Sequence, residues 1–149
     1  MTKAIVSVIL YILSFFSMGI TGDVYVSVGR GDLDAVYDNS SSFIYTCENH
    51  TNKPIYNQAV IIKLEKRVGN DFIDVTSSID TSVKEIAYTI YPHSDDTNRC
   101  EILKPLEPGY YRLWVRYETA ESFGNAKRVT KTIYGDFDVW DHTSSYWPG

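Results

Sequence analysis

The chain alternates apolar and polar positions with a period of two, most clearly in the segment 106–118. This segment opens with a Pro-Gly turn and continues as an extended strand with two distinct faces. The residues expected to face the core are Tyr111, Leu113, Val115 and Tyr117. Those expected on the opposite face are Tyr110, Arg112, Trp114, Arg116 and Glu118. Alternation of this length predicts a half-buried strand of an antiparallel sheet.

Other segments with strand-like patterns are separated by polar turns. They are 23–29, 42–48, 55–66, 72–75, 83–91 and 128–140. Within 55–66, Val60, Ile62 and Leu64 are expected on one face. Gly69-Asn70 predicts a hairpin turn, Gly124-Asn125 predicts another between the last two strands, and Gly135 indicates a bulge.

About seven short strands at regular spacing, without a convincing helix, predict an all-β fold. We expect a single antiparallel β-sandwich over residues 23–140, with a loose C-terminal tail at 141–149. The polar segment 92–99 is expected to be a solvated loop.

The N-terminal 22 residues have the pattern of a targeting segment. Lys3 precedes an apolar run, Ala4–Met18, that is too short for a comfortable membrane span, and small residues follow as far as Gly22. This order is typical of a signal peptide, here residues 1–22, so the mature chain is expected to be secreted, extracellular and without a membrane span. The alternatives are a buried N-terminal helix and an uncleaved anchor.

The two cysteines, Cys47 and Cys100, both lie in the mature part. In an oxidising compartment an isolated pair most simply forms one disulfide, so we expect a Cys47–Cys100 bond. Asn39 and Asn49 each begin an Asn-X-Ser/Thr acceptor sequence, which predicts a glycoprotein in a host that glycosylates its exported proteins.

The formal net charge is −5, and Lys and Arg form no long run, which argues against a nucleic-acid partner or an anionic membrane. The acidic pairs Asp95-Asp96 and Asp136-x-Asp138 do not match a calcium loop. The histidines are scattered without zinc spacing: His50, His93 and His142. There is no nucleophile elbow and no phosphate-binding glycine loop. We expect no metal, no cofactor and no enzymatic activity, although carboxylates that converge only in the fold remain an open alternative.

The stretch Leu106-x-Pro108-Gly109-Tyr110-Tyr111 resembles the tyrosine corner of immunoglobulin-like and fibronectin type III sandwiches. The resemblance implies that Tyr111 points inward and that its hydroxyl bonds to the upstream backbone. The chain departs from the antibody-type pattern, because Leu113 stands where a Cys is expected and segment 55–66 contains no Trp. The outline is also similar to ML-type lipid-recognition sandwiches, which are secreted and hold a lipid between their sheets.

Two surfaces are candidates for binding. Arg30-Gly31-Asp32, in a predicted loop, looks like the tripeptide by which matrix proteins engage integrins; the alternative is an ordinary glycine turn. The outward face of 110–118 combines aromatic rings with guanidinium groups, a combination favoured at binding surfaces. Its candidate residues are Tyr110, Arg112, Trp114 and Arg116. Here the alternative is cross-strand packing that stabilises the sheet without binding anything.

Together these patterns predict an extracellular recognition module for a protein or glycan partner, an integrin being one candidate. The first alternative is a carrier that holds a lipid or small hydrophobic ligand between its sheets. The second is a structural component of the extracellular matrix. A large apolar cavity would favour a carrier, and a packed core with an exposed aromatic patch would favour a recognition module.

Overall fold

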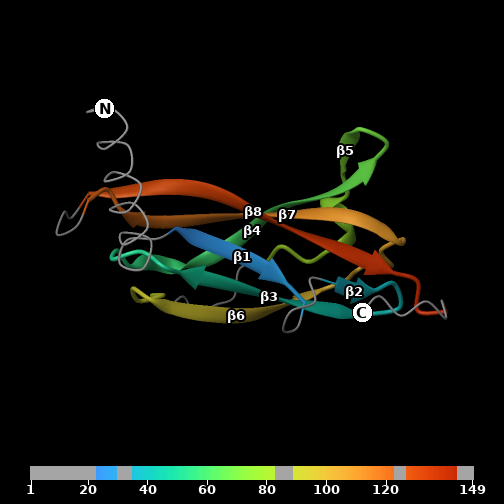
Figure 1. Cartoon of the computed structure of the whole chain (residues 1–149), viewed down its shortest axis with the longest axis horizontal. Coiled ribbons are helices and arrows are strands. Elements are labelled where there is room, and N and C mark those ends of the chain that lie inside the picture. Colours follow the sequence, from blue (N-terminus) through green and yellow to red (C-terminus); the bar gives the residue numbers. More distant parts are fainter. Residues whose placement is uncertain (1–22, 30–34, 83–88, 123–126, 144–149) are drawn as a thin grey trace, which may run out of the picture.

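The structure is a computed structural model that describes residues 23–29, 35–82, 89–122 and 127–143. Within these ranges the chain forms strands and one short 3-10 helix (Figure 1). The strands are β1 (Val24–Val28), β2 (Ala35–Tyr37), β3 (Ser42–Asn49), β4 (Ile55–Val68), β5 (Asp71–Asp74), β6 (Ser94–Glu101), β7 (Gly109–Ala120) and β8 (Arg128–Trp140). The 3-10 helix η1 (Thr76–Ser78) follows β5. The expected signal peptide and most of the expected strand 83–91 lie outside the described residues.

Two sheets pack face to face around one core as an all-β sandwich. One sheet has the order β1-β3-β6 and the other the order β2-β8-β7-β4-β5. The neighbours pair antiparallel except β2 and β8, which pair in parallel. No helix in the described part of the chain is long and apolar enough to cross a membrane.

The described ranges contain more strands than the sequence pattern predicted. Segment 92–99, expected to be a loop, is largely β6, and the short strand β2 was also missed. The prediction failed for β6 because this edge strand turns Asn98 and Cys100 toward the core, where the pattern requires larger apolar side chains.

The central strand β7 is the segment whose alternation was clearest, and its two faces are confirmed. Tyr111, Leu113, Val115 and Tyr117 are at most 6% exposed. The hydroxyl of Tyr111 donates a hydrogen bond to the backbone oxygen of Glu107 at 2.6 Å. This is the tyrosine corner that the resemblance implied, and it fixes the entry of β7 into the sheet.

Aromatic rings join the two sheets in the core. Phe137 of β8 lies between Phe43 of β3 and Tyr111 of β7, with ring centroids 5.6 and 5.5 Å away. Beside them, Leu64 and Leu113 are fully buried. Burial of one such side chain contributes about 2 kcal/mol, so this layer holds the sheets against each other.

Gly135 does not form a bulge, because β7 and β8 stay in continuous register through the Leu113–Gly135 pair. It marks a close approach of two strands instead. A Cβ atom at Gly135 would lie 2.3 Å from the backbone oxygen of Val26 in β1. Only glycine lets the backbone of β1 pack this closely onto β8.

The bulges are in β4, where the pairing with β7 shifts register between Tyr56 and Val60 and again between Ile61 and Lys63. The extra residue turns Ile61 into the core, while Ile62 is 39% exposed. The prediction that Val60, Ile62 and Leu64 share one face is therefore wrong.

The expected Cys47–Cys100 disulfide is absent, and both cysteines are free and buried. In the register of β3 and β6, Cys100 pairs with Phe43, whereas Cys47 pairs with Asp96. The two cysteines are thus four residues apart along one strand pair, or about 13 Å at the usual rise per residue. A disulfide requires Cα atoms within about 7 Å.

Candidate outer-face binding site

Side chains on the solvent side of the five-stranded sheet form rows that cross β4, β7 and β8. We call this surface the outer face. Its first row contains Lys63, Trp114 and Tyr134. Its second row contains Glu65, Arg112 and Asp136. Neighbours within a row are close enough for direct side-chain contact.

Arg112 is the centre of the second row. Its guanidinium carbon lies 4.2 Å from the ring centroid of Phe72 and 4.0 Å from that of Tyr134. Its Nε donates to a carboxylate oxygen of Asp136 at 2.9 Å, and the hydroxyl of Tyr110 donates to the same carboxylate. Arg112 is therefore stacked between two rings and held by a partly buried ion pair.

The hydrogen bonds to Asp136 raise the pKa of both Arg112 and Tyr110. Because a hydrogen bond to a carboxylate favours the protonated donor, the guanidinium stays charged and the phenol stays neutral. Both donors keep these states across the physiological range.

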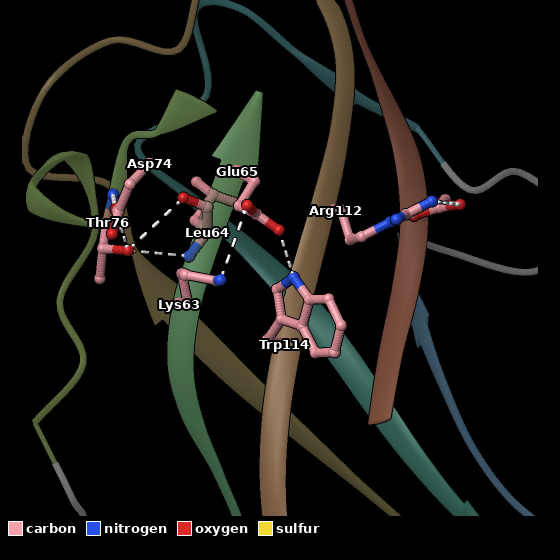
Figure 2. A network of polar contacts seen from close by, with 8 residues as sticks. Lys63, Leu64, Glu65, Asp74, Thr76, Arg112 and Trp114 are labelled. Carbon is pink, nitrogen blue, oxygen red and sulfur yellow. Dashed lines mark hydrogen bonds and ion pairs between the residues drawn. The ribbon is translucent and has the colours of Figure 1, made fainter. Parts of the chain in front are cut away.

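The first row is fixed by a contact between β4 and β7 that Figure 2 shows: the indole nitrogen of Trp114 donates to the carboxylate of Glu65. The same carboxylate pairs with Lys63 at 3.6 Å. The Trp114 ring lies 4.8 Å from that of Tyr134, and the Lys63 amino group lies 5.2 Å from the Trp114 ring centroid.

Thr76 ties the end of β5 to β4 and so keeps Phe72 near the outer face. Its hydroxyl accepts a hydrogen bond from the backbone nitrogen of Leu64 at 3.0 Å and also bonds to Asp74 (Figure 2). The backbone nitrogen of Thr76 donates to the same Asp74 carboxylate. These contacts with Thr76 lower the pKa of Asp74, so Asp74 is ionised at neutral pH and accepts the hydrogen bonds from Thr76.

All four predicted binding residues of segment 110–118 lie on this face, but they differ in accessibility. Tyr110, Arg112 and Trp114 are half-buried, whereas Arg116 is exposed. Tyr134 is 47% exposed and was not predicted. The period-two pattern of segment 128–140 would have placed it on the outward side of the neighbouring strand.

The other predicted sites have different outcomes. The tripeptide Arg30-Gly31-Asp32 lies outside the described residues. Asn39 is exposed in the turn after β2, and its glycosylation stays a prediction.

Asn49 is only 1% exposed. Its side-chain nitrogen donates to the backbone oxygens of Lys53, Ile90 and Tyr91 at 2.8, 3.2 and 3.3 Å. Its side-chain oxygen accepts hydrogen bonds from the backbone and hydroxyl of Thr51. A glycan on this nitrogen is incompatible with the packing, so the geometry argues against glycosylation of Asn49.

Two of the histidines that are scattered in the sequence lie together in the fold. His50 follows β3 and His93 precedes β6, at the same end of the three-stranded sheet. Both line a hollow of about 390 Å³, together with Glu48 and Asp95.

The third histidine, His142, binds the turn after β2. Its backbone nitrogen and its Nδ1 lie 3.0 and 2.6 Å from Asp38 Oδ1. The hydrogen bonds from His142 lower the pKa of Asp38. His142, near the start of the expected loose tail, is therefore held against the turn after β2. Asp38, Asp141 and His142 have ligand-type atoms within 4.8 Å of one another.

A second hollow, of about 240 Å³, lies beside the tyrosine corner. Its lining includes Lys66, Lys104, Leu106 and Tyr111. The amino group of Lys66 is paired with Glu107 at 3.2 Å. The hollow therefore has a mixed lining of charged and apolar side chains.

Comparisons with known proteins add little to this geometry. No protein-family model matches the sequence, and no curated protein matches it. Among solved structures, the fold is similar to the ASH / PapD-like domain of human CEP192 (PapD-like domain 7), with a TM-score of 0.41 and 14% sequence identity. The match covers 81% of this chain and 87% of that chain. A likeness at this level carries no argument about what the chain binds.

Proposed function

We propose that this chain is an extracellular recognition module that binds a protein partner through the outer face of its five-stranded sheet. The observation that carries the proposal is the pair of cross-strand rows centred on Trp114 and Arg112, whose rings and charges are held in place by Glu65 and Asp136. Side chains that are already ordered lose little entropy when a partner binds.

The composition of the outer face favours a protein over a small molecule. Tyr, Trp and Arg are the residue types that dominate the energetically important centres of protein interfaces. Small ligands prefer concave pockets, and the two hollows described above lie elsewhere, at the ends and edge of the sandwich. A sheet face suits a broad contact of about 800 Å² per partner.

The carrier alternative has less support. In the described part of the chain, the space between the sheets is filled by Phe43, Tyr111 and Phe137, with Leu64 and Leu113 beside them. A lipid between the sheets would have to displace this layer. Its loss would forfeit the burial energy that joins the two sheets.

Free cysteines are compatible with export. Burial raises the pKa of the Cys47 and Cys100 thiols to about 12, so both remain protonated at neutral pH. The thiolate is the reactive form, and buried thiols are therefore inert even in an oxidising compartment. The export proposal itself rests on the N-terminal sequence pattern.

The test is comparative capture from the extracellular fluid of the host, followed by mass spectrometry. The outer-face variant is Tyr134→Ala/Arg116→Glu. The control is Tyr25→Ala/Arg99→Glu, which changes the same residue types on the three-stranded sheet; Tyr25 and Tyr134 are each 47% exposed. A partner captured by wild type and control but not by the outer-face variant supports the proposal.

Equal capture by wild type, the outer-face variant and the control contradicts the proposal. Deglycosylation of the fluid before capture distinguishes a protein partner from a glycan partner. If capture by wild type is then lost, the ligand is a glycan and the protein-partner proposal is wrong.

A further inference from the structure

Glu48, His50, His93 and Asp95 combine four potential metal ligands at one end of the three-stranded sheet. Glu48 and Asp95 are direct cross-strand partners in the β3–β6 register. Asn49 points into the core, so its neighbours Glu48 and His50 share the solvent side of β3. His93 lies one position before Ser94, the residue that pairs with Asn49. All four residues line the hollow of about 390 Å³.

The carboxylates make this arrangement unfavourable without a cation. Like charges directly opposite each other on neighbouring strands destabilise a sheet. Neither Glu48 nor Asp95 has a salt bridge to a Lys or Arg among the described residues. A cation in the hollow would relieve this repulsion.

His93 is oriented by a hydrogen bond at one of its ring nitrogens. Its Nε2 lies 2.9 Å from Asn52 Oδ1. An amide oxygen accepts a hydrogen bond, so the tautomer that fits this contact has its proton on Nε2 and leaves Nδ1 available as a ligand. A hydrogen bond from the non-ligating ring nitrogen to an oxygen is the usual support of a ligating histidine.

His50 is positioned by an aromatic contact. Its ring packs edge-to-face against Tyr25, with centroids 5.5 Å apart. Tyr25 pairs with Glu48 in the β1–β3 register and therefore lies on the same side of the sheet. The imidazole is exposed and can turn toward the hollow by rotation of its side chain.

We propose that Glu48, His50, His93 and Asp95 form a binding site for a zinc-type divalent cation. Two imidazole nitrogens and two carboxylate oxygens form a ligand set that Zn²⁺ accepts in tetrahedral geometry. Calcium and magnesium prefer oxygen ligands and are disfavoured by the imidazoles. In the structure the four ligand atoms do not converge, because His50 packs on Tyr25 and His93 bonds to Asn52, so the proposal requires both imidazoles to turn toward the carboxylates.

Among the described residues, Asp38, Asp141 and His142 are the group whose ligand-type atoms already lie within 4.8 Å of one another, a spacing that the four residues of the hollow reach only if their side chains turn. There the Nδ1 and backbone nitrogen of His142 already contact Asp38. Because His142 is already hydrogen-bonded to Asp38, a variant of His142 supplies a matched control.

The experiment is isothermal titration of the chelator-treated protein with Zn²⁺, and with Ca²⁺ as a comparison. The variants are His50→Gln and His93→Gln, with His142→Gln as the control. Circular dichroism establishes that each variant is folded. Loss of a supporting residue alone typically weakens metal binding about 10–100-fold, so loss of either ligand is expected to weaken Zn²⁺ binding at least about tenfold.

The expected result is saturable binding of one Zn²⁺ by wild type and by His142→Gln, weakened in both other variants, with no saturable binding of Ca²⁺. A rise in the melting temperature with Zn²⁺ should follow the same order. The proposal is overturned if wild type shows no saturable binding, if both His50→Gln and His93→Gln bind as wild type does, or if only His142→Gln loses binding. Because this site is on the opposite sheet from the outer face, neither result bears on partner capture.

Discussion

At the scale of single residues, Tyr111 combines two functions that belong to different parts of its side chain. The ring stacks on Phe137 in the core, while the hydroxyl reaches the backbone of Glu107. Burial of the phenol raises its pKa to about 12, so the hydroxyl remains a donor well into the alkaline range. The ring fixes the sandwich, and the hydroxyl fixes the start of β7.

Tyr111→Phe should separate these functions. It keeps the ring but leaves the oxygen of Glu107 without its donor, and we expect a loss of about 1–2 kcal/mol in the free energy of unfolding. The measurement is the urea midpoint at unchanged slope. Tyr134→Phe, at an exposed position, is the control and should change stability by less than about 0.5 kcal/mol. Equal midpoints for wild type and Tyr111→Phe would refute the structural role of the corner.

Gly135 illustrates a residue whose importance lies in what it lacks. Its own pairing with Leu113 is regular, so the constraint comes only from the 2.3 Å approach that a Cβ would make to Val26. No backbone strain is involved, which distinguishes this glycine from Gly69 in the β4–β5 turn, where φ is +64°.

Gly135→Ala should force β1 away from β8 and cost about 3 kcal/mol, at the upper end of overpacking in a core. Thermal unfolding with circular dichroism measures the effect. At Gly69 a side chain meets nothing within 4 Å, and Asn tolerates positive φ, so Gly69→Asn should be nearly neutral. If Gly135→Ala melts at the wild-type temperature, β1 does not pack on β8 in this way.

At the scale of elements, the outer face depends on Arg112 linking three strands. It contacts Phe72 on β5 and Tyr134 and Asp136 on β8 from its own position on β7. Because the guanidinium is planar, it can lie between two rings and still bond to a carboxylate. A lysine has no such geometry.

Arg112→Lys is therefore expected to lower the free energy of unfolding by about 1 kcal/mol, despite the conserved charge. A double-mutant cycle with Asp136→Asn measures how much of this depends on the ion pair. The structure predicts a coupling of about 0.5–1 kcal/mol between the two positions, in the range of half-buried pairs. Strict additivity of the two changes would mean that Arg112 and Asp136 do not act together.

The elements also show how far the sequence alone could be read. Strand β7 was predictable with both faces, because its inward residues are large and alternate without interruption. Strand β6 was not, since its edge position lets polar residues occupy core-side positions. The bulges of β4 rotate Ile61 inward through pairing with β7, which no local pattern encodes.

The same limit applies to the candidate sites. The binding residues of segment 110–118 follow from one strand's alternation and were predicted. The grouping of His50 with His93 depends on the register of two strands far apart in sequence. The prediction of a Cys47–Cys100 disulfide failed because of the same register. Register is set by the whole sandwich, because a one-residue slip would exchange the faces of a strand.

At the scale of the whole molecule, the buried thiols make stability sensitive to alkaline pH. Burial raises the pKa of Cys47 and Cys100 from an ordinary value of 9.0 to about 12. Between these values the unfolded chain releases protons that the folded chain retains. The free energy of unfolding is therefore at its full value below about pH 9 and falls as the pH rises toward about 12.

Urea midpoints measured under reducing conditions at about pH 8 and about pH 11 should show this fall. In Cys47→Ala the fall should be smaller, whatever the variant's stability at neutral pH, because one titrating group is gone. A wild-type stability that stays constant between the two pH values would contradict the burial of the thiols.

The most direct test of the recognition proposal is the dissociation constant of the captured partner for three proteins: wild type, Tyr134→Ala and Tyr25→Ala. The two tyrosines are equally exposed on opposite sheets. If the outer face is the binding surface, Tyr134→Ala should weaken binding about thirtyfold, equivalent to about 2 kcal/mol, and Tyr25→Ala should change it less than about twofold. Equal dissociation constants for wild type and Tyr134→Ala, or a loss confined to Tyr25→Ala, would contradict the proposal.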